Sequence, residues 1–385
     1  GKEGDGLKIA LITLNTGRLS IPGAAVGGTK VLLQISRQWA NERVQWGFPI
    51  GKHEAVAHKL SDMMSTIFAM EGMIDICSLL ADNGNYDLRM EAAAAKEYHT
   101  SRGWDIVDET LQIRGGRGYE TADSLMNRGE DPIGVERIMR DARINRIFEG
   151  STEIMYLFLA REAVDKHLEV AGALVDPKAS MGERLAALPK IGLFYLWWYP
   201  TRYLGFSFWP KYGKHGKLAK HLRFADRATR RVSRAIFHGM MVHRAKLQRR
   251  QAFLSRIVDI GIELFAMCSA VHQVQRMKTG GNAEHVKEAA LAADIFCKGA
   301  RRRINDRFKA LWSNDDIARY NFAQKILKDE FKWFEREGVL NLDEQMAAVA
   351  GKAGKSAPAL VSNNEGPTRS KQAAQEEAPS KAVAS

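Results

Sequence analysis

The stretch RDARINRIFEGSTEIMYLFLAREA, residues 140–163, places Glu149 between an aromatic residue and a glycine, directly before apolar residues at helical spacing. A carboxylate in such a place can act as a general base where water is excluded, because desolvation raises its pKa toward the working pH. The simplest alternative makes Glu149 an ordinary acid that the N-terminus of the following helix stabilises. The surroundings of the residue must decide between the two.

Other motifs with catalytic or metal-binding chemistry fail on spacing. His53 and His58 in HEAVAH are five residues apart, so on a helix they point about 140° from each other instead of sharing a face. Cys77, Cys268 and Cys297 lie far apart without Cys-x-x-Cys spacing, which predicts neither a disulfide framework nor a zinc site. The glycine patterns of dinucleotide folds, P-loops and serine hydrolases are also missing from the sequence. We therefore expect no metal.

Charge is concentrated in one part of the 385-residue chain. Residues 190–250 carry 15 Lys or Arg and one acid, a local charge of +14, so the rest of a chain with net charge +12 carries −2. The overall basicity is therefore no argument for nucleic-acid binding. The longest clean apolar run, residues 191–199, is about half the roughly 20 residues that a membrane-spanning helix needs. We expect no ordinary transmembrane segment.

Apolar residues recur at three- and four-residue spacing through most of the first 170 residues, and no stretch shows sustained alternation. This pattern predicts an all-α fold in which residues 1–172 form a four-helix bundle. The four long helices are expected at residues 6–45, 52–82, about 88–113 and about 151–170, with a polar loop at 121–132 and a short helix near 133–141.

The second half divides by composition. Residues 173–217 contain four prolines and a dense aromatic cluster, which predicts a linker with the composition of a membrane-surface segment. Helical spacing returns afterwards, so residues 218–345 are expected to form a second helical domain. Residues 346–385 are poor in aromatic and β-branched residues, which predicts a disordered tail.

Four stretches together resemble the acyl-CoA dehydrogenases, and among them the long-chain and very-long-chain type with an added C-terminal helical region. They are LNTGRLSIPGAAVG (14–27), ERVQWGFPIGKHEAV (42–56), QIRGGRGYE (112–120) and the stretch at 140–163. Their order and spacing fit the family's C-terminal half from residue 1 to about 170. In that family an N-terminal helical domain and a β-domain precede this part.

The resemblance implies FAD-dependent α,β-dehydrogenation of a fatty acyl-CoA to the trans-2-enoyl-CoA, as in fatty acid β-oxidation. A base removes the α-proton, the β-hydrogen leaves as hydride, and hydrogen bonds polarise the thioester carbonyl. Glu149 matches the base, Phe148 matches an apolar wall and Gly150 matches a close backbone approach to the thioester. Some relatives take the base from the position of Gly17, which here cannot supply one.

The same resemblance implies the binding residues. The substrate channel is matched by Asn15, Thr16, Gly17 and Arg18. Contacts with FAD, some of them across a subunit interface, are matched by Arg43, Gln45, Trp46, Gln112, Ile113, Arg114, Gly115, Gly116, Ser151, Thr152 and Glu153. Relatives usually carry other residues at Trp46, Arg114 and Ser151, so these flavin contacts are the less specific ones.

The implied partners are fatty acyl-CoA, an electron-transferring flavoprotein, a second copy of the chain and an anionic membrane surface, with no nucleic acid. The implied compartment is the bacterial cytoplasm or the mitochondrial matrix, at the inner membrane. The alternative is a non-catalytic helical module that binds membrane or RNA through its basic and aromatic segment. The two readings differ in whether the protein, joined to the family's N-terminal half, purifies yellow with flavin.

Overall fold

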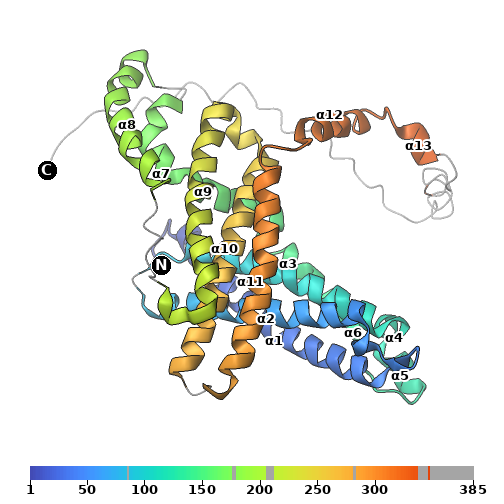
Figure 1. The fold of residues 1–385 in the computed structure, drawn as a ribbon. Helices are drawn as coiled ribbons and strands as arrows, with labels where there is room; N and C mark the ends of the chain where they lie inside the picture. Colours follow the sequence, from blue (N-terminus) through green and yellow to red (C-terminus); the bar gives the residue numbers. More distant parts are fainter. Residues whose placement is uncertain (85, 176–178, 205–211, 281–282, 337–345, 347–385) are drawn as a thin grey trace. The chain divides into compact units, whose positions relative to one another are not determined.

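The computed structural model describes residues 1–84, 86–175, 179–204, 212–280, 283–336 and 346, drawn in colour in Figure 1. Residues 1–314 form one compact unit, and residues 315–385 are a second. The predicted all-α class is confirmed, since among the described residues the only strands are β1 (Val44–Gln45) and β2 (Phe48–Pro49). The predicted disordered tail lies outside the described residues, apart from residue 346.

The helices of the first unit follow the predicted order. They are α1 (Gly6–Glu42), α2 (Glu54–Asp82), α3 (Arg89–Arg114), α4 (Gly116–Tyr119), α5 (Ala122–Asn127), α6 (Val135–Arg143), α7 (Thr152–Val175), α8 (Met181–Thr201), α9 (Ala219–His243), α10 (Gln251–Thr279) and α11 (Val286–Ala310). In the second unit the described helices are α12 (Asp316–Ile326) and α13 (Lys332–Arg336).

Helices α1 and α3 lie side by side and run in the same direction. The Ser36 hydroxyl donates to Thr110 Oγ1 at 3.2 Å, and two turns earlier a Cβ built on Gly103 would lie 3.8 Å from a Thr29 methyl group. The absence of a side chain at Gly103 allows this close approach, because its Cα faces the Thr29 methyl group directly. Successive turns of α1 and α3 therefore lie opposite each other along the helix pair.

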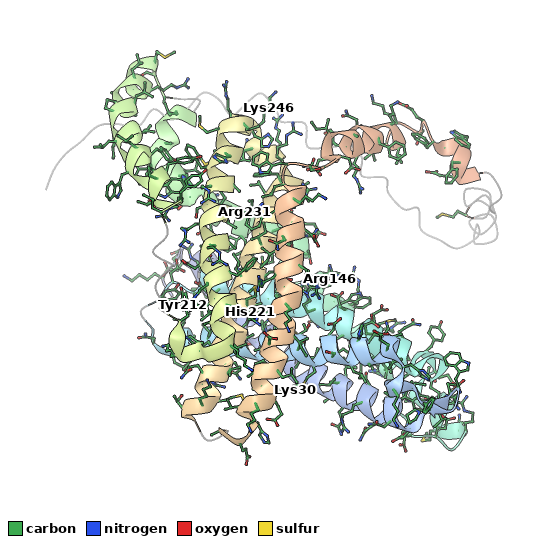
Figure 2. The ribbon with its side chains drawn as sticks, in the orientation of Figure 1. Lys30, Arg146, Tyr212, His221, Arg231 and Lys246 are labelled. Atoms are coloured by element: carbon green, nitrogen blue, oxygen red, sulfur yellow. The ribbon has the colours of Figure 1, made fainter. Side chains whose placement is uncertain are left out.

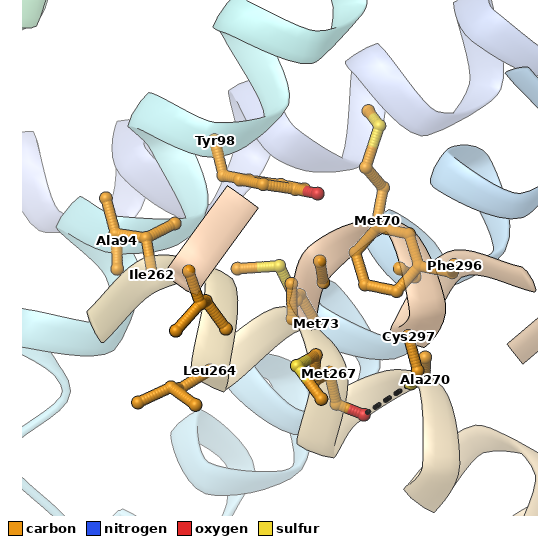
Figure 3. Packing of buried hydrophobic residues seen from close by; sticks show 14 of the residues in the cluster. Met70, Met73, Ala94, Tyr98, Ile262, Leu264, Met267, Ala270, Phe296 and Cys297 are labelled. Carbon is orange, nitrogen blue, oxygen red and sulfur yellow. Dashed lines mark hydrogen bonds between the residues drawn. The ribbon is translucent and has the colours of Figure 1, made fainter. Parts of the chain in front are cut away.

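Helices α9, α10 and α11 are not a separate layer, because α10 and α11 pack directly on α2 (Figure 1). A Cβ on Gly72 of α2 would lie 2.7 Å from the Ser269 carbonyl oxygen of α10, so the two backbones touch there. Figure 3 shows the resulting core, in which Met70 and Met73 of α2 meet Met267 of α10. Residues of the bundle and of the second helical region thus share one hydrophobic core.

A buried ion triad joins the same elements. The Glu263 carboxylate of α10, whose side chain is 7% exposed, accepts from Arg102 of α3 at 2.9 Å and from Arg303 of α11 at 2.8 and 2.9 Å. Because guanidinium forks satisfy both carboxylate oxygens, the buried charge is compensated. The triad links α10 and α11 to α3.

Three local elements of the structure were not foreseen from the sequence pattern. The proline-rich segment expected as a linker contains α8, with Pro189 and Pro200 inside the helix and a capping box between Ser180 and Glu183 at its start. The polar loop contains α5, which Thr121 caps. A hairpin forms at 44–49, where Trp46 and Gly47 both have positive φ, as a two-residue turn between paired strands requires.

By length and composition alone, α2 is apolar enough to cross a membrane, the one such helix found among the described residues. Half of its apolar window is buried against other helices of the unit. A core helix of a folded protein meets the same criterion, and the packing of α2 against α1, α3, α10 and α11 is of that kind.

Candidate active site

Glu149 lies in a tight turn between a 3₁₀ segment, Ile144–Arg146, and the start of α7. Its φ is +53°, a left-handed conformation that side chains other than glycine seldom adopt, and Gly150 follows at φ +97°. Side chains rarely adopt this φ, and a Cβ on Gly150 would also have to displace the end of the Met155 side chain, so the position favours glycine. The turn therefore presents Glu149 in a strained conformation that the surroundings must maintain.

The Glu149 carboxylate lies on the backbone of α1. A Cβ built on Gly17 would come 2.8 Å from Cδ of Glu149 and 3.0 Å from Oε1, closer than any real side chain allows. Oε2 is buried and has no hydrogen-bond partner among the described residues. The carboxylate thus occupies the place that a side chain at position 17 would take, with one oxygen free to accept a proton.

A buried lysine holds the turn from behind. Lys96 of α3, with no exposed surface, donates from Nζ to the carbonyl oxygens of Phe148 at 3.1 Å and of Gly150 at 2.6 Å. Burial lowers the pKa of this lysine, and nearby Glu97 and Glu149 act against that shift. The two carbonyls that flank Glu149 converge on one ammonium group.

Arg18 adds a second cation beside the carboxylate. Burial lowers the pKa of Arg18, and the negative charge of Glu149 raises it again. Its guanidinium lies 5.7 Å from the ring centroid of Phe158 on α7. Arg18 and Glu149 therefore lie near each other in the structure. Asn15 and Thr16 precede them on α1, but their side chains fall outside the described residues.

Helix α7 begins directly after this turn. Thr152 lies beside Glu97 of α3. Burial raises the pKa of the Glu97 carboxyl, and the hydrogen bond that Ser101 donates to it at 2.6 Å lowers that pKa again. The first amides of α7 have no partner one turn earlier in their own helix, as at any helix start, and can receive an anionic or carbonyl oxygen. A small cleft, lined by Thr152, Glu153, Tyr156 and Leu157 of α7 and by Gln251, Leu254 and Ser255 of α10, opens beside them.

The other predicted residues gather at the far end of α1 and α3. Trp39 of α1 stacks against the guanidinium groups of Arg114 at 5.1 Å and of Arg117 at 5.6 Å. Burial lowers the pKa of Arg114, and its Nε is buried without a partner among the described residues. Nothing lies within 4 Å of a Cβ built on Gly115 or Gly116, so the backbone there is open to a ligand.

Arg43 caps α1 at this same end, and the hairpin after it presents Trp46 with 86% of its surface exposed. Gln45 and Gln112–Arg114 complete the group. Position 17 and position 43 are separated by 26 residues of one helix, about 39 Å at 1.5 Å per residue. The structure therefore brings the predicted residues together in two places, one around Glu149 and one around Arg43 and Gly115.

Lys96 and Glu97 are functional candidates that the sequence did not reveal. Both stand in EAAAAKEYH, which has the composition of an ordinary helix with a solvated polar face. The alanine run before them is the one signal of a close helix contact, and it does not say which partner follows.

Comparison with known proteins identifies the family of the chain. Residues 4–164 match the family model of the acyl-CoA dehydrogenase C-terminal domain, and residues 216–333 match the model of the ACAD9/ACADV C-terminal domain. The chain belongs to the acyl-CoA dehydrogenase family, in the branch that carries this second domain. The resemblance inferred from the motifs is confirmed.

Particular relatives give the scale of the match. The probable acyl-CoA dehydrogenase FadE10 of Mycobacterium tuberculosis is 47% identical over 345 residues, 89% of this chain and 53% of that protein. The human very long-chain specific acyl-CoA dehydrogenase, mitochondrial, is 29% identical over 82% of this chain and 46% of its own length. The chain spans about half the length of these curated relatives.

A solved structure supports the fold. The crystal structure of an acyl-CoA dehydrogenase complexed with FAD from Bacillus anthracis matches 91% of this chain and 57% of its own, with TM-score 0.58 and 24% identity. At this identity the similarity speaks for the arrangement of helices, including those of the second region, and not for individual contacts.

Proposed function

We propose that the chain supplies the base-bearing helical part of an FAD-dependent dehydrogenase that converts a fatty acyl-CoA to its trans-2-enoyl form. The observation that carries this proposal is the Glu149 carboxylate, held in a left-handed turn against Gly17 with one buried oxygen unpaired. A base for an α C–H bond needs this combination of fixed direction, partial desolvation and an available oxygen.

The chain's own residues divide the work around the reacting carbon. Glu149 takes the α-proton onto its free oxygen, Oε2. Its backbone amide donates to the thioester carbonyl and stabilises the charge that develops there. Arg18 places positive charge beside the carboxylate, and Phe148, 40% exposed, forms an apolar wall for the acyl chain.

The residues fit FAD, which when bound accepts the β-hydrogen as hydride. The unpaired Arg114 Nε, the open backbone at Gly115 and Gly116 and the exposed Trp46 suit a group with charged phosphates and flat rings. Ser151, Thr152 and Glu153 offer helix-start amides beside the base. The FAD-bound relative from Bacillus anthracis has the same arrangement of helices.

The two groups of flavin-matched residues support a pairing of two chains. They lie about 39 Å apart along α1, so we infer that each flavin is held by the α7 start of one chain and by Arg43, Gln112 and the Gly115 turn of another. Light scattering of the flavin-loaded protein tests this inference. A monomer with a full complement of FAD would contradict it.

We also propose that α8 holds the protein on an anionic membrane surface without crossing it. The outward side of α8 exposes Leu193 (72%), Leu196 (75%) and Trp197 (78%), while Tyr195 and Trp198 face inward and pack on Phe237 of α9. Basic residues of the neighbouring segment add attraction to anionic lipid. The RNA-binding alternative has no observation in its favour.

Several of those basic residues already have partners inside the fold. Arg231 of α9, labelled in Figure 2, lies 4.0 Å from the ring centroid of Phe308, and Lys220 pairs with Asp294 at 2.8 Å. The free charge of residues 190–250 is therefore smaller than their composition indicates. The apolar side of α8 carries most of the membrane proposal.

The remaining partners are proposed from family membership. Electrons leave the flavin to an electron-transferring flavoprotein, and the protein works in the bacterial cytoplasm or the mitochondrial matrix. The human relative's name places that protein in mitochondria.

Replacing the base tests the proposed function. We expect Glu149→Gln to keep FAD and lose about 10²- to 10⁴-fold in turnover, the usual contribution of a general base. The substitution is made in a chimera in which the N-terminal part of the 47% identical mycobacterial relative precedes this chain. Flavin bleaching by acyl-CoA under anaerobic conditions measures the loss, and more than about a tenth of the unsubstituted rate would place the base elsewhere.

A further inference from the structure

Lys96 is the most deeply buried ionisable group near the proposed base, and the reaction described above does not use it. It has no exposed surface, it comes from α3, and its two hydrogen bonds go to backbone carbonyls 52 and 54 residues later in the chain. An ammonium group is costly to bury, so its presence among alanines needs a reason.

The geometry gives that reason. The carbonyls of Phe148 and Gly150 stand directly before and after Glu149, and both point at Nζ. Binding the two together bends the backbone between them, and this bend contains the φ of +53° at Glu149. A strained residue persists only where the surroundings fix it, and a charge-assisted pair of hydrogen bonds is a strong way to do so.

We propose that Lys96 is a positioning residue that clamps the turn on both sides of Glu149 and thereby directs its carboxylate onto Gly17. The inference rests on the proposed function for its catalytic consequence, and on the contacts alone for the clamp. Without the clamp the turn relaxes and the carboxylate leaves the surface of α1.

The clamp is tested first in the 385-residue chain by hydrogen exchange. Lys96→Met keeps the length and apolar stem but removes the donors, and we expect the amides of residues 149–151 to exchange at least about tenfold faster while α10 peptides stay protected. Lys96→Gln retains an N–H₂ donor and should fall between. Lys59→Met, which removes a lysine paired with Glu109 far from the turn, should leave the turn unchanged.

The catalytic consequence is tested in the chimera. A base displaced by about 1 Å costs about 10²-fold, so Lys96→Met should slow flavin bleaching by that order while the Kd for acyl-CoA changes less than about threefold. Loss of binding and rate together, or equal loss of protection throughout α3 and α7, would make Lys96 a general core residue and overturn the proposal.

The two arms fail in different ways. If the unsubstituted chimera binds acyl-CoA without bleaching flavin, the proposed function is wrong, and exchange at 149–151 still decides whether the clamp exists. If bleaching is normal in the unsubstituted chimera and Lys96→Met changes neither exchange nor rate, the clamp is wrong and the function stands.

Discussion

The absence of a side chain at Gly17 is what allows the Glu149 carboxylate to reach α1. A side chain at position 17 and the Glu149 carboxylate would occupy the same space, so only one of the two can be present.

Gly17→Ala tests whether one added methyl group at position 17 displaces the Glu149 carboxylate. The new Cβ would overlap the carboxylate and move it, so we expect a loss of about 10²-fold in flavin bleaching with FAD content unchanged. Gly23→Ala is the matched control, because it lies in the same helix with nothing within 4 Å of its Cβ. It should keep full activity and be slightly stabilised by alanine's helix propensity. Equal activity of the two variants would show that the carboxylate does not lie on Gly17.

The sequence predicted Glu149 because its neighbours form a motif that is continuous in the chain. Lys96 could not be predicted in this way, because its partners are carbonyls more than 50 residues later and any residue type can supply a carbonyl. The same limit applies to Glu97, because its proximity to Thr152 follows only from the packing of α7 on α3.

Among the elements, long helices with regular apolar spacing were predicted to within a few residues, and α8 was not. Its prolines, Pro189 and Pro200, suggested a linker, yet both are inside the helix. Ser180 and Glu183 form a capping box at its start, a Ser-x-x-Glu pattern that the linker prediction did not take into account. The hairpin at 44–49 was too short for any alternation to show.

Helix α8 also carries a prediction, because its two sides differ. We expect the chain to float with phosphatidylglycerol vesicles, less at high salt, and a variant with Leu193, Leu196 and Trp197 changed to Ser to stay behind, since apolar side chains anchor the helix at the lipid boundary. The matched control changes Met241, Val242 and Leu291, which are 62–64% exposed on other helices. If both variants float as well as the parent, α8 is not the membrane contact.

For the whole molecule, composition predicted two helical domains with a boundary near residue 217, and those boundaries stay predictions. Periodicity gives each helix an apolar face without saying which faces meet. Periodicity could not predict the shared core, in which Met73 of α2 packs with Met267 of α10 (Figure 3). The second helical region therefore packs on the same bundle in which α1 and α3 carry the candidate site.

This support is measurable at the ion triad. Glu263→Gln leaves Arg102 and Arg303 facing each other, and we expect a loss of about 2–4 kcal/mol in the free energy of unfolding by urea, below the full range for buried pairs because both arginines keep some contact with water. Asp75→Asn also breaks a link to α10, through Arg276, but at an exposed pair, and should cost under about 1 kcal/mol. Similar losses in both variants would mean that the triad is no stronger than a surface contact.

The packing of α10 on α2 can form only late during synthesis of the chain. Asp75 and its partner Arg276 are separated by 201 residues, and a ribosome that adds about 5–20 residues per second needs roughly 10–40 s to make that interval. During this time α7, α8 and α9 are synthesised, and the side of α2 that packs on α10 and α11 has no partner. The nascent chain therefore exposes part of the apolar surface of α2 until α10 and α11 have been synthesised and can pack on it.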